Sequence, residues 1–184
     1  MLGIWKKIEN YLGSRNAELL EELSEPVTND FLENYLRNLN IQQDDFFESL
    51  RIHDGQNHGY HALSYPWQLL NSEDIQENAK RLLELFPIEE YPDGRTAYGF
   101  VKEDIWNDKW IPFASDESGN FLCVDYDPAE GGSIGQVILW ASDPPYVEVI
   151  APSYRSWLEQ FANDLEAGKF KWDAENDEWL RVNS

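Results

Sequence analysis

The stretch WIPFASDESGNFLCVDYDPAEGGSIGQV, residues 110–137, decides the fold of this chain. Its first part, 110–114, is a short apolar run, and 121–126 is a run of β-branched and aromatic residues, so each predicts a β-strand. The polar residues between them include Asp116 and Gly119, which favour a tight turn. The sequence therefore predicts two neighbouring strands joined by a short connection.

The same pattern continues after this pair. Asp, Pro and Gly residues are concentrated at 127–135 and break regular structure before the apolar run 136–140. Asp143-Pro144-Pro145 then interrupts the chain before a last apolar run at 146–150. Short strands joined by tight polar turns predict an antiparallel meander.

The motifs of this region occur in a characteristic order. W-I-P-F-A begins at Trp110, D-x-x-G-N begins at Asp116, a strand ends in Asp125, and D-P with G-x-x-G-Q-V-I follows at 127–138. Two flanking segments add to the pattern. The first is I-H-D-G-Q at 52–56, and the second runs from W-L-x-x-F to D-L-E-x-G at 157–168. Over about residues 28–168 the chain resembles the SMI/KNR family of the SUKH superfamily.

This resemblance implies an α+β fold in which a sheet is flanked by helices. It also implies one of two binding roles. Some members of the superfamily are bacterial immunity proteins that neutralise toxins, and others are fungal regulators of cell-wall synthesis.

Outside the meander, apolar residues recur at helical spacing. Groups at three-and-four spacing predict helices around 5–12, 19–23, 31–39, 46–50, 75–86 and 154–165. Ser72 and Ser153 are expected to be the N-caps of the last two helices, and Gly55 is expected to close the fourth. Residues 60–63 read as a short strand.

We therefore expect residues 1–184 to form a single α+β domain with a central, mainly antiparallel sheet flanked by helices. The expected parts are a family-like core at about 28–168, an N-terminal helical extension at 1–27 and a C-terminal hairpin or docked tail at 169–184. Aromatic residues make up 14% of the chain, which is enough for a dense core despite 27% charged residues.

The charge balance limits the partners. The chain has 35 acidic and 14 basic residues, a formal net charge of −21 and a sequence pI near 4.3. Direct binding to nucleic acid or to an anionic membrane is not expected, because both rely on Lys and Arg. The negative electrostatic field of such a chain instead attracts a basic protein, although acidity can also serve only to keep the protein soluble.

The compartment follows from the cysteine count and the apolar runs. Cys123 is the only cysteine, so no internal disulfide can form, and its place in a predicted strand indicates a buried thiol in a reducing compartment. No stretch approaches the length of a transmembrane helix, and Ile8-Glu9-Asn10 stands where a secretion signal needs an apolar run. We expect a cytoplasmic protein without membrane insertion.

The candidate catalytic and metal-binding motifs lack the neighbouring residues that such sites need. The G-x-S-x-G pattern at 131–135 would need a helix after Ser133 and a later histidine, but a β-prone run follows and all histidines precede it. His53, His58 and His61 lie close together without the spacing of a zinc site. We therefore expect no enzyme activity, no cofactor and no metal.

The acidic residues of the meander have an alternative structural use. Asp125 and Asp127 begin like a calcium loop. Ala129, however, stands where an oxygen ligand is needed, and Gln136 stands where a bidentate Glu belongs. Asp116, Asp125 and Asp127 are better explained as caps of backbone amides at turns.

The tryptophans fall into two groups. Trp110, Trp140 and Trp157 lie in strongly periodic segments and are assigned to the core. Trp5, Trp106 and Trp179 lie outside the strongest of these patterns and are candidates for exposed partner anchors.

Two function hypotheses follow from the resemblance and the charge. The first is an immunity protein that binds and neutralises a basic bacterial toxin domain, with a nuclease as one candidate. The alternative is a regulatory scaffold in cell-wall or cell-envelope biogenesis. The residues carried over as partner-binding candidates are His53, Asp54, Gly55, Gln56, Asp116, Asn120, Asp125 and Gln136. The same motifs can also mark turns that the fold needs.

Overall fold

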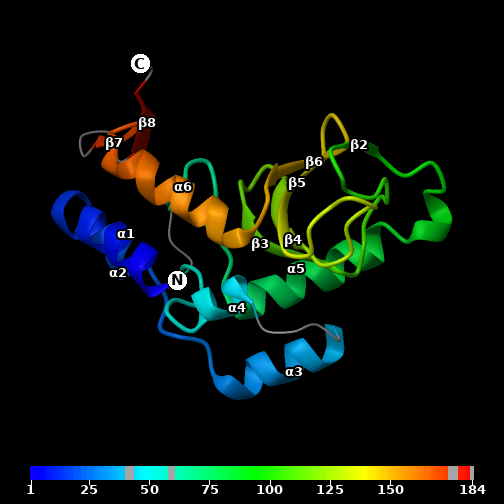
Figure 1. Cartoon of the computed structure of the whole chain (residues 1–184), viewed down its shortest axis with the longest axis horizontal. Coiled ribbons are helices and arrows are strands. Elements are labelled where there is room, and N and C mark those ends of the chain that lie inside the picture. The colour runs from blue at the N-terminus through cyan, green and yellow to red at the C-terminus, as the bar shows by residue number, and fades with distance from the viewer. Residues whose placement is uncertain (40–43, 58–60, 174–177, 183–184) are drawn as a thin grey trace.

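The computed structural model describes residues 1–39, 44–57, 61–173 and 178–182. Figure 1 shows the arrangement of its elements. In chain order they are α1 (Leu2–Arg15), α2 (Ala17–Glu21), α3 (Asn29–Leu39), α4 (Asp45–Leu50), β1 (Gln68–Leu69), α5 (Ser72–Leu85), the 3-10 helix η1 (Ile88–Glu90), β2 (Thr96–Tyr98), β3 (Trp110–Ser115), β4 (Phe121–Asp125), β5 (Gln136–Ala141), β6 (Tyr146–Ala151), α6 (Tyr154–Glu166), β7 (Phe170–Asp173) and β8 (Glu178–Arg181).

A six-stranded sheet forms the centre of the fold, with the strand order β1-β3-β4-β5-β6-β2. The neighbours from β1 to β6 pair antiparallel, and only β2 pairs parallel, with β6. The predicted meander is confirmed, as is an α+β fold with a mainly antiparallel sheet, flanking helices and further helices near the N-terminus. Strands β7 and β8 form a separate hairpin beyond α6 (Figure 1).

The prediction of a strand at 60–63 is wrong where it can be compared. Residues 61–63 have no strand structure, and residue 60 lies outside the described residues. The strand in this region is β1, which pairs Gln68 with Ser115 and Leu69 with Ala114. An isolated edge strand of this kind is fixed by its partner and leaves little trace in the local sequence.

The two faces of the sheet carry separate apolar clusters, because side chains alternate along each strand. On β4, Leu122 and Val124 belong to the cluster covered by α1, α4 and α6. Phe121 and Cys123 belong to the second cluster, with Leu82 of α5 and the loop after β2 on the opposite face. Cys123 has no exposed surface, which confirms the predicted burial of the thiol.

The expectation that three tryptophans are exposed anchors is wrong. Trp5, Trp106 and Trp179 are 0%, 3% and 5% exposed, respectively. The indole of Trp5 donates to Ser49 Oγ at 2.8 Å, and that of Trp179 donates to the carbonyl of Ala62 at 2.8 Å. Trp5 lies on the same buried face of α1 as Ile8 and Leu12, whereas Trp179 is held by a segment distant in sequence.

Side-chain caps fix the starts of several helices. Ser153 caps α6 as predicted, by accepting from the amide of Ser156. At α5 the cap is Asn71 and not Ser72, since Asn71 Oδ1 accepts from the amides of Glu73 and Asp74. Among the described helices, none combines the length and hydropathy needed to cross a membrane.

Gly55 does not close α4, whose C-cap is Arg51, but it marks a close approach between two backbone segments. Its φ of +64° lies in the left-handed region. A Cβ atom at this position would lie 2.3 Å from the carbonyl oxygen of Leu70. The segment that follows α4 can therefore pass beside the segment that enters α5 only if residue 55 has no side chain.

Replacement of Gly55 by alanine should lower the free energy of unfolding by roughly 2 kcal/mol or more, because alanine is strained in the left-handed conformation and its Cβ would clash with the carbonyl of Leu70. Gly3 is the matched control, since a Cβ there meets no atom within 4 Å. Gly3→Ala should be neutral or slightly stabilising, because alanine favours helix. Urea denaturation of both variants provides the comparison, and equal effects would contradict the steric account.

Candidate functional site

Gln56 is the most highly bonded of the candidate residues. Its side chain is 2% exposed and connects several segments. Oε1 accepts from the backbone amides of Leu63 at 3.1 Å and Leu69 at 3.0 Å. Nε2 donates to the carbonyl of His61 at 2.9 Å and to Glu22 Oε2 at 3.3 Å. One buried amide therefore fixes both ends of the segment 61–69.

His53 and Asp54 hold neighbouring helices in place. His53 Nε2 lies 2.8 Å from Glu9 Oε1, and its ring packs edge-on against Trp5. Asp54 accepts from the amide and the hydroxyl of Ser72, at 2.8 and 2.6 Å. Burial raises the pKa of Asp54, although the bonds from Ser72 oppose this shift. Both side chains are partly exposed, so contact with a partner stays a prediction.

Asp116 organises the turn between β3 and β4. Its Oδ1 accepts from the amides of Ser118 and Asn120, and its Oδ2 accepts from the side-chain amide of Asn120 at 2.7 Å. Asn120 Oδ1 in turn accepts from the amide of Ser142 at 2.8 Å, which ties this turn to the β5–β6 turn. Partial burial pushes the pKa of Asp116 upwards, but these hydrogen bonds outweigh it and the pKa lies below its usual value.

Asp125 and Gln136 form a buried pair on adjacent strands. Asp125 is 0% exposed and accepts from Trp110 Nε1, the amide of Asp127 and Gln136 Nε2. Gln136 is 3% exposed, and its Nε2 also donates to the carbonyl of Phe100 at 2.9 Å. Burial raises the pKa of Asp125, although these three donors oppose the shift.

The expectation that three aspartates cap backbone amides holds for Asp116 and Asp125. Asp127 instead accepts from two side chains, Lys102 Nζ and Asn107 Nδ2. Both donors lie in the loop that precedes β3, which the pairing of Trp110 with Asp125 brings next to Asp127.

The candidate residues therefore divide into two groups. The side chains of Gln56, Asp125 and Gln136 are buried, so any influence on a partner has to pass through the loops that they hold. Gly55 is also buried and acts through its backbone. The partly exposed members are His53, Asp54, Asp116 and Asn120, and for them a direct contact remains open to test.

The segment held by Gln56 and the turn organised by Asp116 both line one cavity of about 410 Å³. The segment held by Gln56 supplies His61, Tyr65 and Gln68, and the turn organised by Asp116 supplies Asp116, Glu117 and Ser118. The C-terminal hairpin closes the cavity with Trp172 and Trp179. We call this the hairpin pocket. Neither motif alone indicated it, because the hairpin reaches it from the other end of the chain.

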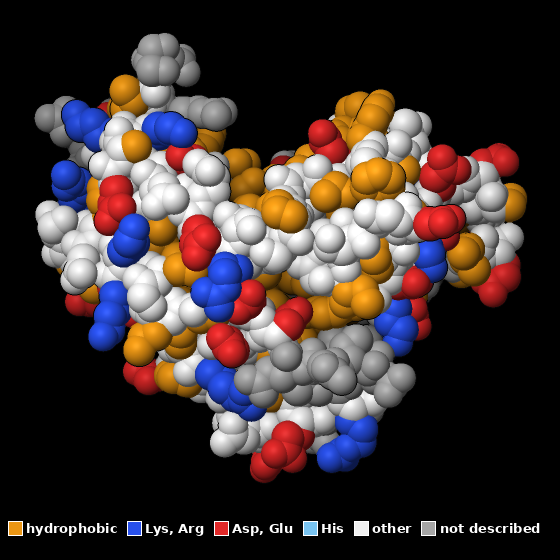
Figure 2. Space-filling model, in the orientation of Figure 1, with side chains coloured by type: hydrophobic (Ala, Val, Ile, Leu, Met, Phe, Trp, Pro, Cys, Tyr) orange, Lys and Arg blue, Asp and Glu red, His pale blue; other side chains and the backbone are white. Residues whose placement is uncertain are grey.

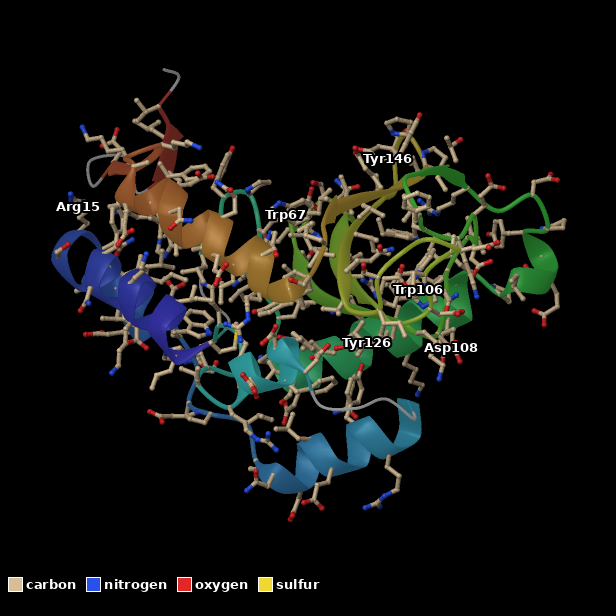
Figure 3. All side chains as sticks on the ribbon, viewed as in Figure 1. Arg15, Trp67, Trp106, Asp108, Tyr126 and Tyr146 are labelled. Carbon is tan, nitrogen blue, oxygen red and sulfur yellow. The ribbon has the colours of Figure 1, made fainter. Side chains whose placement is uncertain are left out.

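A second cavity, of about 310 Å³, adjoins the same two segments. It is lined by Ser64, next to Tyr65, and by Phe170 of β7, together with Ile150 of β6 and Trp157 of α6. Figure 2 shows hydrophobic side chains in the notch between the C-terminal hairpin and the sheet. In Figure 3, Trp67 lies at the boundary of α6 and the sheet. The surface near the hairpin pocket is therefore hollowed and partly apolar.

The third cavity, of about 400 Å³, lies on the other side of the sheet. It is lined by apolar residues of α5 and η1 and by Trp106, and by the carboxylates Glu89, Asp104, Asp108 and Asp127. Trp106 and Asp108 lie near α5 in Figure 3. It is a shallow acidic depression and contains none of the eight candidate residues.

The residues considered for catalysis and metal binding have the following surroundings. Ser133 lies in an exposed turn, where its amide donates to Gln136 Oε1, and β5 follows it. His53 and His61 lie against Glu9 and Glu22, and His58 lies outside the described residues. Within the described ranges, no group of three His, Cys, Asp or Glu side chains is placed to hold a metal ion.

Replacement of Asp125 by alanine should lower the free energy of unfolding by about 2–4 kcal/mol, because it strands the buried donors Trp110 Nε1 and Gln136 Nε2. The exposed Glu130 is the control, and Glu130→Ala should change stability by less than about 0.5 kcal/mol. Chemical denaturation measures both. Loss of partner binding with unchanged stability would show that Asp125 acts as a contact residue and not as a structural one.

The stability should also depend on pH in a defined direction. Burial raises the folded-state pKa of Asp44, Asp54 and Asp125, so the folded protein binds protons that the unfolded chain releases. Their contribution is present below the unfolded pKa, ~4, and is lost as pH rises through the higher folded pKa. The melting temperature should therefore increase as the pH falls from neutral towards the ordinary aspartate pKa, aided by reduced repulsion among acidic groups.

Asp116 and Asp127 have lowered pKa values and act in the opposite sense, so stability should fall again below about pH 4. A thermal unfolding series across this pH range tests both limbs. A melting temperature that decreases steadily from neutral pH downwards would contradict the burial effect.

Comparison with known proteins identifies the family. Residues 26–160 match the SMI1 / KNR4 family (SUKH-1). The chain is 25% identical to the "Cell wall assembly regulator SMI1" of Saccharomyces cerevisiae, over 96% of this chain and 42% of that protein. It is 27% identical to the "Glucan synthesis regulatory protein" of Neurospora crassa, over 95% of this chain and 40% of that protein.

A third relative is the "Cell wall biosynthesis/cell cycle regulator smi1" of Schizosaccharomyces pombe, which is 33% identical over 75% of this chain and 30% of that protein. The chain spans less than half the length of these curated relatives. The family match covers most of the chain and includes the motifs at 52–56 and 110–138. The chain therefore belongs to the SMI1 / KNR4 family (SUKH-1).

Proposed function

We propose that this chain is a non-enzymatic, protein-binding regulatory module in cell-wall or glucan biogenesis. The observation that carries this proposal is the similarity of nearly the whole chain to fungal proteins described as regulators of cell-wall assembly and glucan synthesis. The comparisons thus favour the second of the two function hypotheses over the first.

The surface of the protein supports a binding role. The hairpin pocket and the cavity beside it form an indented area with aromatic walls. Hydrophobic and aromatic side chains around a concavity, with a few polar groups to orient a ligand, are typical of recognition sites. The formal net charge of −21 would steer a basic partner towards such a surface.

The toxin-neutralising hypothesis depends on the same acidity and on the bacterial branch of the superfamily. A basic toxin domain would satisfy the charge argument equally well. The three relatives above, however, are described as regulators and not as immunity proteins. A cytoplasmic location belongs to both hypotheses and is part of this proposal.

Deletion in the native cell of the segment that encodes this chain separates the two functions. We expect a change in the glucan content of the wall and greater sensitivity to glucanase digestion, and re-expression of the chain should reverse both. The control is re-expression of Gly55→Ala, which should fail because the fold is weakened. An unchanged wall, together with new sensitivity to a toxin produced by neighbouring cells, would overturn the regulatory function in favour of immunity.

A further inference from the structure

The hairpin pocket has one wall of preset aromatic rings. Trp172 and Trp179 pack edge-to-face with ring centroids 5.4 Å apart, and His61 packs edge-on against Trp172 at 5.2 Å. The hydrogen bond from Trp179 Nε1 to Ala62 fixes the hairpin against the segment 61–69. Tyr65, on that segment, is 53% exposed and completes the wall. Tyr65 and Trp172 are the accessible rings of this wall, and the buried Trp179 supports them.

The other wall is acidic. Asp116 and Glu117 both line the pocket, and the lining residues that the structure describes include no Lys or Arg. Asp116 has its pKa below the usual value, so it carries a full negative charge at neutral pH. Glu117 is exposed. A cationic group in the pocket would therefore meet two carboxylates that no lining cation neutralises.

The backbone conformation of Glu117 is a further sign that this residue has a functional role. Its φ of +60° makes it the only non-glycine residue with positive φ among the residues described. Glycine or asparagine adopts this conformation with less strain than glutamate does. A glutamate at such a position sacrifices stability, and residues of this kind occur often at binding sites.

Aromatic faces next to carboxylates favour a cation that is both flat and charged. A guanidinium group stacks on aromatic rings and pairs with carboxylates, whereas an ammonium group is more strongly hydrated and gains less from stacking. A cavity of about 410 Å³ is large enough for one such side chain and its neighbours. We propose that the hairpin pocket binds an arginine side chain from an exposed basic segment of the protein partner.

This inference rests on the protein-binding function proposed above, and it specifies the chemistry of the partner. The segment that carries the arginine would extend towards the cavity of Ser64, Ile150 and Phe170, whose apolar surface suits the neighbouring side chains. The negative charge of the whole chain brings the segment to the surface, and the pocket selects arginine within it.

The test uses a short fluorescein-labelled Gly/Ser peptide that carries arginine, with citrulline in place of arginine as the neutral control of nearly the same shape. Fluorescence anisotropy at low salt should show binding of the arginine peptide, with the citrulline peptide weaker by about tenfold or more. The indole N–H signals of Trp172 and Trp179 should shift in the NMR spectrum on addition of the arginine peptide only.

Variants distinguish the pocket from the general field. Glu117→Gln should weaken binding several-fold, and so should Tyr65→Ala, whereas Glu130→Gln removes the same charge outside the pocket and should change affinity by less than about twofold. Glu117→Gly should raise the melting temperature, because glycine accepts the backbone conformation, while it still weakens binding.

Equal effects of Glu117→Gln and Glu130→Gln would overturn the proposal, because binding would then come from net charge alone. Equal binding of the arginine and citrulline peptides, or no binding at low salt, would overturn it as well. If the peptide fails to bind but deletion of the segment still alters the wall, only the pocket assignment falls. If the peptide binds as expected and the wall is unaffected by the deletion, only the regulatory function falls.

Discussion

The buried side chain of Gln56 is the interaction on which the candidate binding surface depends. The segment 61–69 has little regular structure of its own, so its backbone groups need partners from elsewhere. Gln56 supplies an acceptor for the amides of Leu63 and Leu69 and a donor for the carbonyl of His61. The segment thereby becomes rigid enough to support the C-terminal hairpin through the bond between Ala62 and Trp179.

The motif residues and the residues of the binding surface have different roles. Gly55, Gln56, Asp125 and Gln136 are buried and position loops, and Asp116 shapes a turn and also lines the pocket. The residues that would meet a partner, such as Tyr65, Glu117 and Trp172, lie outside the motifs quoted from the sequence or at positions within them that carry no fixed letter. Such a division lets one scaffold present different surfaces to different partners.

Sequence patterns predicted the meander well because each strand carries its own apolar run and each turn its own Asp, Gly or Pro. They did not predict β2, a strand of three residues whose partner is β6, since Thr96 pairs with Tyr146 far along the chain. The same limit applies to Trp179. Trp179 bonds to Ala62, and local spacing carries no record of this contact, whereas Trp5 shares the buried face of α1 with Ile8 and Leu12. The hairpin pocket was missed for this reason, since it is assembled from three segments that only the tertiary fold brings together.

Amide hydrogen exchange at Leu63 and Leu69 tests most directly whether Gln56 organises the pocket. In the unaltered protein both amides should be strongly protected, because each donates to a buried oxygen. In Gln56→Leu, which keeps the site apolar but removes the acceptor, both should exchange at least about tenfold faster than the fall in global stability requires, while the amides of β4 follow global stability alone. If Leu63 and Leu69 instead change in step with β4, the segment is held by other contacts and the central claim is contradicted.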